Sequence, residues 1–197
     1  MWVKLCGLRT AADVEAAVAA GADAVGFVLV DSPRQVDDGQ ARALAARVAG
    51  RATTVGVFRR LDSAALARSR ALGLDLAQGV LDGVAAGEGV LPVLADGSDL
   101  PDRAAATPAS RLLVDGPHFG SGETADWDRI AAVARGRSIV LAGGLAPDNI
   151  ARAIARVRPG GVDVSSGIES ERGVKDPQRM HAFVRAARRA AASMESP

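Results

Sequence analysis

The chain alternates short apolar runs with alanine-rich stretches, and this alternation occurs eight times within 197 residues. Runs rich in valine, leucine and isoleucine predict strands that are buried on both faces, and strands separated by helices pair in parallel. We predict strands at Val3–Cys6, Ala24–Leu29, Thr53–Phe58, Leu74–Gln78, Val90–Leu94, Leu112–Asp115, Ile139–Ala142 and Val162–Val164. We predict helices at Ala11–Ala20, Asp38–Ala49, Ser63–Leu72, Ser98–Ala105, Asp126–Ala134, Pro147–Val157 and Asp176–Ala192.

Eight strand–helix units in so short a chain favour an α/β fold, a compact (β/α)8 TIM barrel formed by a single domain over residues 1–197. A doubly wound open sheet is the competing architecture, but no glycine-rich nucleotide fingerprint follows the first strand. The connection after the fourth strand, GVLDGVAAGEG, is rich in glycine. We therefore expect only a turn or a short, degenerate helix at that point.

Composition excludes several classes of function. The 24 Lys and Arg residues nearly balance the 23 Asp and Glu residues, and a net charge of +1 selects for neither nucleic acid nor an anionic membrane. No apolar run reaches transmembrane length and the N-terminus lacks a signal-peptide core, so we expect a cytoplasmic protein. We also predict a monomer. With one cysteine, Cys6, and two histidines, the sequence predicts neither an intrachain disulfide nor a metal site.

The segment from Ser138 to Asp176 carries the most specific local signal. Two predicted strands each break into a loop of small residues, Gly143-Gly144 and Ser165-Ser166-Gly167, and the second loop continues into an acidic turn before the last helix. In a (β/α)8 barrel the loops after strands seven and eight often bind phosphate, because backbone N–H groups there can approach the oxygens. We therefore predict a phosphate site, although either loop alone would suit an ordinary strand-to-helix turn.

The ends of the other strands supply candidates for the reacting groups, because catalytic residues of this fold lie at the C-terminal ends of its strands. The candidates are Cys6, Arg34, Gln78 and Asp115. A cysteine thiolate can abstract a proton, and a carboxylic acid can protonate a leaving oxygen. Three of these residues have a structural alternative: a lone cysteine often packs in a core, an aspartate before glycine often forms a turn, and most loop arginines are solvated.

Alternation along the first strand places Lys4 on the same face as Cys6, so both side chains are expected to point into the barrel. The eighth strand adjoins the first in a closed barrel, and Asp163 lies on it. An unpaired lysine inside the barrel would be costly, so we predict that Lys4 and Asp163 form a buried ion pair that supports the site.

Seven segments, in this order, carry a resemblance to a known family: VKLCG, GFVLVDSPRQV, VGVF, LLVDG, GSGETADW, LAGGLAPDNI and DVSSGIESERGVKD. Together they span nearly the whole chain and resemble the phosphoribosylanthranilate isomerase family of tryptophan biosynthesis, an amino-acid biosynthesis pathway. The resemblance implies an aldose–ketose isomerase that converts N-(5-phosphoribosyl)anthranilate into 1-(2-carboxyphenylamino)-1-deoxyribulose 5-phosphate by an Amadori rearrangement. That reaction needs no cofactor.

The resemblance also assigns roles to individual residues. It implies that Cys6 is the general base, that Asp115 is the general acid, and that Arg34 lies near the anthranilate moiety. Gln78 is expected to contact the substrate, and the loop Gly120-Ser121-Gly122 is expected to close over it. The partner is therefore expected to be a small phosphorylated substrate.

Two departures from the family pattern keep alternatives open. The family usually has a Gln-Leu-His-Gly run after the fourth strand, whereas this chain reads AQGVLDG and lacks the histidine. The loop before Ser32-Pro33-Arg34 is also about one residue shorter. These differences suit a paralogue acting on a related phosphosugar or aminoaldose. The related histidine-pathway isomerase would carry an aspartate at Cys6 and a two-fold repeat, and a non-catalytic phosphate-binding barrel would need neither Cys6 nor Asp115.

Overall fold

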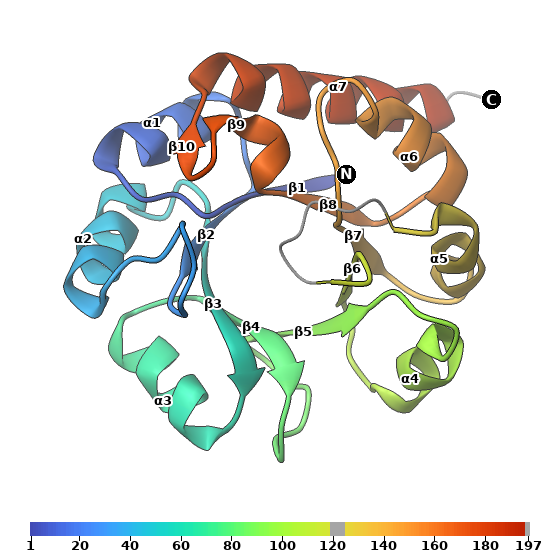
Figure 1. Ribbon diagram of the computed structural model, residues 1–197, viewed down its shortest axis with the longest axis horizontal. Coiled ribbons are helices and arrows are strands. Elements are labelled where there is room, and N and C mark those ends of the chain that lie inside the picture. Colours follow the sequence, from blue (N-terminus) through green and yellow to red (C-terminus); the bar gives the residue numbers. More distant parts are fainter. Residues whose placement is uncertain (119–124, 196–197) are drawn as a thin grey trace.

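Eight parallel strands close into a barrel in the computed structural model, which describes residues 1–118 and 125–195 (Figure 1). Neighbours in the sequence are neighbours in the barrel, and β1 pairs with β8 through Trp2 opposite Gly161 and Lys4 opposite Asp163. The strands are β1 (Trp2–Cys6), β2 (Ala24–Val28), β3 (Thr53–Leu61), β4 (Leu76–Leu81), β5 (Val90–Ala95), β6 (Leu112–Asp115), β7 (Ile139–Leu141) and β8 (Gly161–Val164). The predicted fold class and the eight predicted strands are confirmed.

Helices surround the barrel, as Figure 1 shows. They are α1 (Ala11–Ala19), α2 (Asp38–Val48), α3 (Ser63–Ala71), α4 (Leu100–Ala106), α5 (Trp127–Ala134), α6 (Ile150–Val157) and α7 (Pro177–Glu195). Capping boxes start α1 at Thr10 and α2 at Asp37, where the side chain and the third helical residue satisfy each other's backbone N–H groups. The connection between β4 and β5 contains no helix, so the expected interruption is confirmed.

Several predicted boundaries are wrong by a few residues, each for a local reason. β4 starts at Leu76 rather than Leu74, because the Asp75 carboxylate accepts hydrogen bonds from the Thr54 N–H and hydroxyl, both at 2.7 Å, in place of ladder pairing. α6 starts at Ile150 rather than Pro147, because Asn149 Oδ1 accepts from Ala146 N at 2.9 Å and closes a turn first. β3 continues past its predicted end through an irregularity in its pairing with β4.

The segment after β8 is more ordered than the acidic turn predicted for it. A 3-10 turn, η1 (Ser166–Ile168), leads into an antiparallel hairpin of β9 (Glu169–Glu171) and β10 (Val174–Lys175), and α7 follows. Asp176 Oδ1 accepts from Gln178 N at 2.8 Å and caps the start of α7. The hairpin therefore lies over the C-terminal end of β8, where the candidate site is expected.

Two apolar layers fill the molecule. The larger packs the helices against the outside of the barrel, and the smaller lies inside it with Trp2 packed against the buried residues Leu91, Val93, Leu113, Val140 and Ala142. Lys4 and Cys6 follow Trp2 along the same face of β1, so the interior changes from apolar to polar toward the C-terminal ends of the strands. Within the described ranges, no helix has the length and apolar character needed to cross a membrane.

Candidate active site

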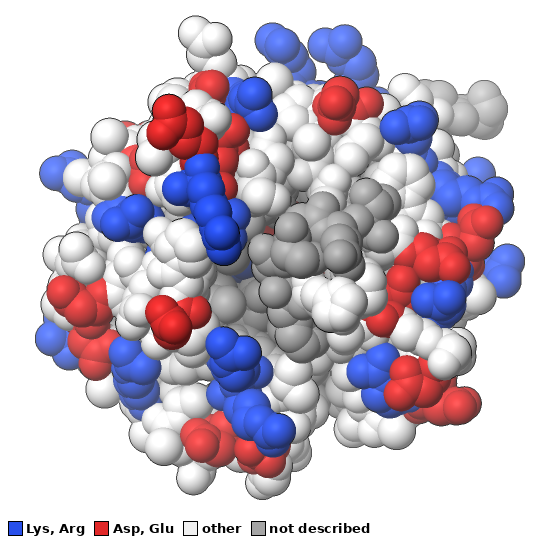
Figure 2. Space-filling view, in the orientation of Figure 1, with Lys and Arg blue, Asp and Glu red and all other residues white. Residues whose placement is uncertain are grey.

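A cavity of about 230 Å³ lies at the C-terminal ends of the strands. Its lining includes all four residues predicted from the strand ends, Cys6, Arg34, Gln78 and Asp115, together with Asp163 and Ser165. The barrel therefore brings together groups from β1, β4, β6 and β8 that are far apart in the sequence. On the face seen in Figure 2, basic and acidic side chains are interspersed, so this face presents no broad field of one sign.

Cys6 is buried at the end of β1 with 6% of its surface exposed. Gly26 on β2 leaves room for it, because a Cβ at Gly26 would lie 2.9 Å from the sulfur and 3.1 Å from Lys4 Nζ. Burial raises the pKa of the Cys6 thiol above its ordinary value; the charge of Lys4 opposes this, Asp163 adds to it, and Lys175 also opposes it. The thiol is therefore protonated at neutral pH and gains base character as the pH rises.

The predicted ion pair is confirmed: Lys4 Nζ donates to Asp163 Oδ1 at 2.9 Å, and both residues are buried. Burial lowers the pKa of Lys4, but the opposite charges of Asp163 and Cys6 outweigh that effect, and the net shift is upward. Lys4 is therefore a permanent cation next to the thiol.

Asp115 ends β6 and lines the cavity, and its Oδ1 accepts a hydrogen bond from Gly116 N at 2.8 Å. The loop after β7 comes very close to this point. A Cβ at Gly143 would lie 2.5 Å from Gly116 N and 3.2 Å from Asp115 Oδ1, and Gly143 has a φ of +83°. Glycine is therefore required at 143, and it places the candidate acid beside the candidate phosphate loop.

The two predicted phosphate loops meet around a smaller pocket of about 50 Å³, lined by Gly143, Gly144, Ser165 and Ser166. Within residues 1–118 and 125–195, the N–H groups of Gly143 and Gly144 donate to no other residue, which leaves them available to an anion. Asn149 Nδ2 donates to Gly144 O at 2.8 Å and holds the loop. Gly167 packs against the carbonyl of Leu145, so its predicted phosphate contact stays a prediction.

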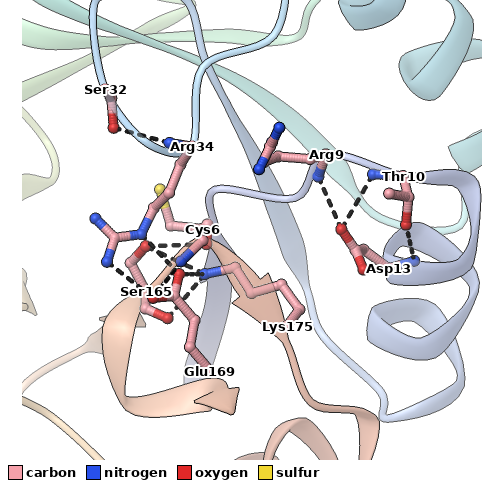
Figure 3. Close-up of polar contacts among 10 residues, drawn as sticks. Cys6, Arg9, Thr10, Asp13, Ser32, Arg34, Ser165, Glu169 and Lys175 are labelled. Carbon is pink, nitrogen blue, oxygen red and sulfur yellow. Dashed lines mark hydrogen bonds and ion pairs between the residues drawn. The ribbon is translucent and has the colours of Figure 1, made fainter. Parts of the chain in front are cut away.

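Arg34 is not a solvated loop arginine, which was the structural alternative, but is held by an ion pair. It is 8% exposed, and its Nε and Nη2 donate to the two carboxylate oxygens of Glu169 at 2.7 and 3.0 Å. Lys175 Nζ donates to the same carboxylate at 2.7 Å, and Figure 3 shows these side chains gathered beside Cys6 and Ser165. Burial opposes ionisation of Glu169, but hydrogen bonds from Arg34 and Lys175 outweigh it and lower its pKa to about 2.

Gln78 presents a buried side-chain acceptor to the cavity. It is 6% exposed, it lines the cavity, and its Oε1 is a buried acceptor with no hydrogen-bond partner among the described residues. A buried acceptor without a partner costs free energy, so the site is suited to a molecule that supplies an N–H or O–H donor.

Some site residues were missed by sequence reasoning, and some predicted ones cannot be placed. Glu169 and Lys175 were part of a predicted acidic turn, and only their opposite charges hinted at a pair. Arg59 at the end of β3 also lines the cavity.

The predicted lid residues Gly120, Ser121 and Gly122 lie outside the described residues. Within the described ranges, no three His, Cys, Asp or Glu side chains form a cluster that could hold a metal ion.

A closed eight-stranded barrel with a cysteine, an aspartate and two loops of small residues at one end defines a (β/α)8 enzyme. Residues 3–186 match the family described as N-(5'phosphoribosyl)anthranilate (PRA) isomerase. The chain belongs to this family.

Individual relatives agree with the family match. The N-(5'-phosphoribosyl)anthranilate isomerase of Chromohalobacter salexigens is 44% identical over 198 residues, which cover 92% of each chain. The phosphoribosyl anthranilate isomerase of Thermus thermophilus superposes with a TM-score of 0.83 at 31% identity, covering 99% of this chain and 100% of that one. A phosphoribosyl anthranilate isomerase in complex with reduced 1-(o-carboxyphenylamino)-1-deoxyribulose 5-phosphate gives a TM-score of 0.81 at 28% identity, covering 95% and 98% of the chains.

Proposed function

We propose that Cys6 and Asp115 isomerise N-(5'-phosphoribosyl)anthranilate to 1-(2-carboxyphenylamino)-1-deoxyribulose 5-phosphate. The observation that carries this proposal is the single cavity shared by Cys6, Asp115 and Arg34, which adjoins a small-residue anion pocket in a chain of the isomerase family. The Chromohalobacter salexigens relative is named for the isomerisation of this substrate, and one solved isomerase is in complex with the reduced form of this product. The chain is an isomerase of tryptophan biosynthesis.

The reaction follows from two proton transfers. Asp115 donates a proton to the ribose ring oxygen, the C1′–O bond breaks, and the anilino nitrogen stabilises the resulting iminium ion. The Cys6 thiolate then removes the proton from C2′, and its electrons form the C1′–C2′ double bond of an enaminol. Loss of the C2′ hydroxyl proton and protonation of C1′ give the ketone, so the product has the same atoms as the substrate.

Phosphate anchors one end of the substrate. The N–H groups of Gly143 and Gly144 and the loop Ser165-Ser166-Gly167 suit its oxygens. Since Gly143 also touches the Asp115 loop, a phosphate held here fixes the ribose next to the acid. Binding energy at the phosphate then orients carbons that react several bonds away.

Arg34 and Gln78 suit the other groups of the substrate. Glu169 occupies the Nε–Nη2 edge of the Arg34 guanidinium, and the remaining edge through Nη1 suits a planar acceptor such as the anthranilate carboxylate. The unpaired Gln78 Oε1 suits the anilino N–H or a ribose hydroxyl. Lys4 and Asp163 support the base from below. The lid role of Gly120-Ser121-Gly122 remains part of the proposal.

Residues 1–197 are proposed to act as one domain, because β1 and β8 must pair to close the barrel that carries the site. A cytoplasmic monomer stays the prediction for state and location. Light scattering of the purified protein tests the monomer.

The test of the function is direct. Purified protein is mixed with freshly made phosphoribosylanthranilate, and the loss of anthranilate-type fluorescence is followed while the product is identified by mass and by reduction to a stable amine. Turnover of this substrate, and none of an analogue without the carboxylate, supports the proposal. Turnover only of a different N-glycoside would point to the paralogue reading that the missing histidine leaves open.

A further inference from the structure

Two buried charges beside Arg34, those of Glu169 and Lys175, have no role in the reaction described above. Arg34, Glu169 and Lys175 are 8%, 6% and 7% exposed, and the two cations share the one carboxylate. We name these three residues the cationic cluster, because two positive charges and one negative charge leave an excess of one positive charge. Burying a surplus charge is costly unless something compensates it.

The cationic cluster is tied to the end of the strand that carries Cys6. Lys175 Nζ donates to Ser165 O at 2.8 Å and to Ser165 Oγ at 3.3 Å, and Ser165 Oγ donates to the backbone carbonyl of Cys6 at 3.2 Å. On the other side, a Cβ at Gly7 would lie 2.7 Å from Arg34 Cδ, so Arg34 packs directly on the residue after Cys6. Figure 3 shows Cys6, Ser165 and the cluster together, apart from the group around Arg9 and Asp13.

The other charges around Cys6 do not supply a compensating negative charge for the cluster. On β1 and β8, Lys4 and Asp163 neutralise each other at 2.9 Å. Asp115 lines the cavity from β6, where its proposed role requires a proton. The cavity lining from β3 and from the loop after β2 adds Arg59 and Asp31, one charge of each sign.

We propose that Arg34, Glu169 and Lys175 form a positioned cation whose surplus charge stabilises the thiolate of Cys6. Glu169 keeps the two cations at the base of the site, and the cations stabilise the thiolate when Cys6 loses its proton. The proposal deepens the proposed function, because it takes Cys6 as the base. Burial raises the pKa of the thiol, and the charge of Lys175 opposes that rise. Burial also lowers the pKa of Lys175, and the charges of Glu169 and Cys6 reduce this shift without reversing it. The pKa of Arg34 is raised, mainly by its hydrogen bonds to Glu169 and in smaller part by Cys6.

Lys175 and Glu169 are thus positioning residues, and the sign of the charge removed provides the test. Lys175→Met makes the cluster neutral, so the apparent pKa of Cys6 should rise by roughly one unit, whereas Glu169→Gln makes it doubly positive and should lower that pKa by a similar amount. A packing defect would not be expected to shift the pKa of Cys6 in opposite directions in these two variants. Cys6 is the only cysteine, so thiolate ultraviolet absorbance and the rate of iodoacetamide alkylation against pH both report this one group.

Two further variants complete the experiment. Arg60→Met is the matched control, because it removes an exposed cation that pairs with Asp82 and should leave the titration unchanged. The double variant Lys175→Met with Glu169→Gln removes one charge of each sign, leaves Arg34 as the single surplus cation, and should titrate like the parent. The proposal would be overturned if the apparent pKa of Cys6 were equal in the two single variants or shifted in the same direction in both. It would also be overturned if that pKa were shifted in the double variant.

These measurements need no substrate. A chain that titrates as expected but does not turn over phosphoribosylanthranilate would contradict the proposed function and leave the cluster intact. Turnover of the substrate by a protein whose thiol pKa is the same in the parent and in both single variants would support the proposed function and contradict the role of the cluster.

Discussion

Lys4 on β1 and Asp163 on β8 form a buried ion pair across the seam that closes the barrel, with Nζ 2.9 Å from Oδ1. The pair lies between the apolar interior layer at Trp2 and the thiol of Cys6. The same contact therefore joins the first strand to the last and supplies a fixed cation below the base.

Replacing Lys4 by Met should lower the free energy of unfolding by roughly 3–5 kcal/mol, because it leaves the Asp163 carboxylate buried without its partner. Urea denaturation followed by circular dichroism measures this. The control is the double variant Lys4→Met with Asp163→Leu, which removes both charges and should recover most of the loss. A cost for Lys4→Met no larger than that of breaking the exposed pair of Arg60 and Asp82 would show that the interior pair contributes little.

Replacing Cys6 by Ala should lower kcat by about 10²–10⁴-fold, because it removes general-base catalysis of proton loss from C2′. KM should change much less, since Cys6 makes no proposed contact with phosphate or carboxylate. Steady-state fluorescence kinetics measure both constants, and circular dichroism verifies the fold. Turnover close to that of the parent would remove Cys6 from the mechanism.

The strand ends could be predicted because parallel strands in a barrel all end on one side. Alternation along β1 was enough to place Lys4 and Cys6 on one face, and closure was enough to place Asp163 opposite Lys4. The partner of Arg34 could not be predicted in this way. Glu169 is 135 positions further along the chain, in a short hairpin with little apolar content, and its pairing depends on how that hairpin folds over β8.

The pH profile of kcat/KM should be bell-shaped, because Cys6 must lose a proton and Asp115 must keep one. The raised pKa of the thiol means that the thiolate fraction increases with pH through the neutral range. Asp115→Asn should lower the rate and abolish the fall on the alkaline side, leaving a rate that rises until Cys6 is ionised. Binding of a reduced product analogue, measured by calorimetry, should stay nearly unchanged. A bell-shaped profile of kcat/KM that is unchanged in Asp115→Asn would show that another residue is the general acid.

Replacing Gly143 by Ala should weaken phosphate binding, because the new Cβ would collide with Gly116 N and the residue has a positive φ. We expect a higher KM and weaker competition by inorganic phosphate. Gly50→Ala is a matched control, since Gly50 also has a positive φ of +72° but nothing within 4 Å of its Cβ position. Both variants share the backbone strain, so a loss of phosphate competition in Gly143→Ala alone assigns the effect to the loop. Equal effects would argue against an anion site there.

Replacing Arg34 by Ala should weaken binding of a product analogue that carries the carboxylate by roughly 1.5–3 kcal/mol, the range for a hydrogen bond to a charged group. The analogue without the carboxylate should lose much less, and calorimetry of both analogues gives the difference. Arg59→Ala is the comparison, because it removes another cation that lines the same cavity but is exposed, and its effect should be smaller. If Arg59→Ala costs more than Arg34→Ala, the carboxylate binds at the end of β3. If neither variant distinguishes the two analogues, the barrel and its isomerase chemistry stand, and anthranilate is not the group that these arginines recognise.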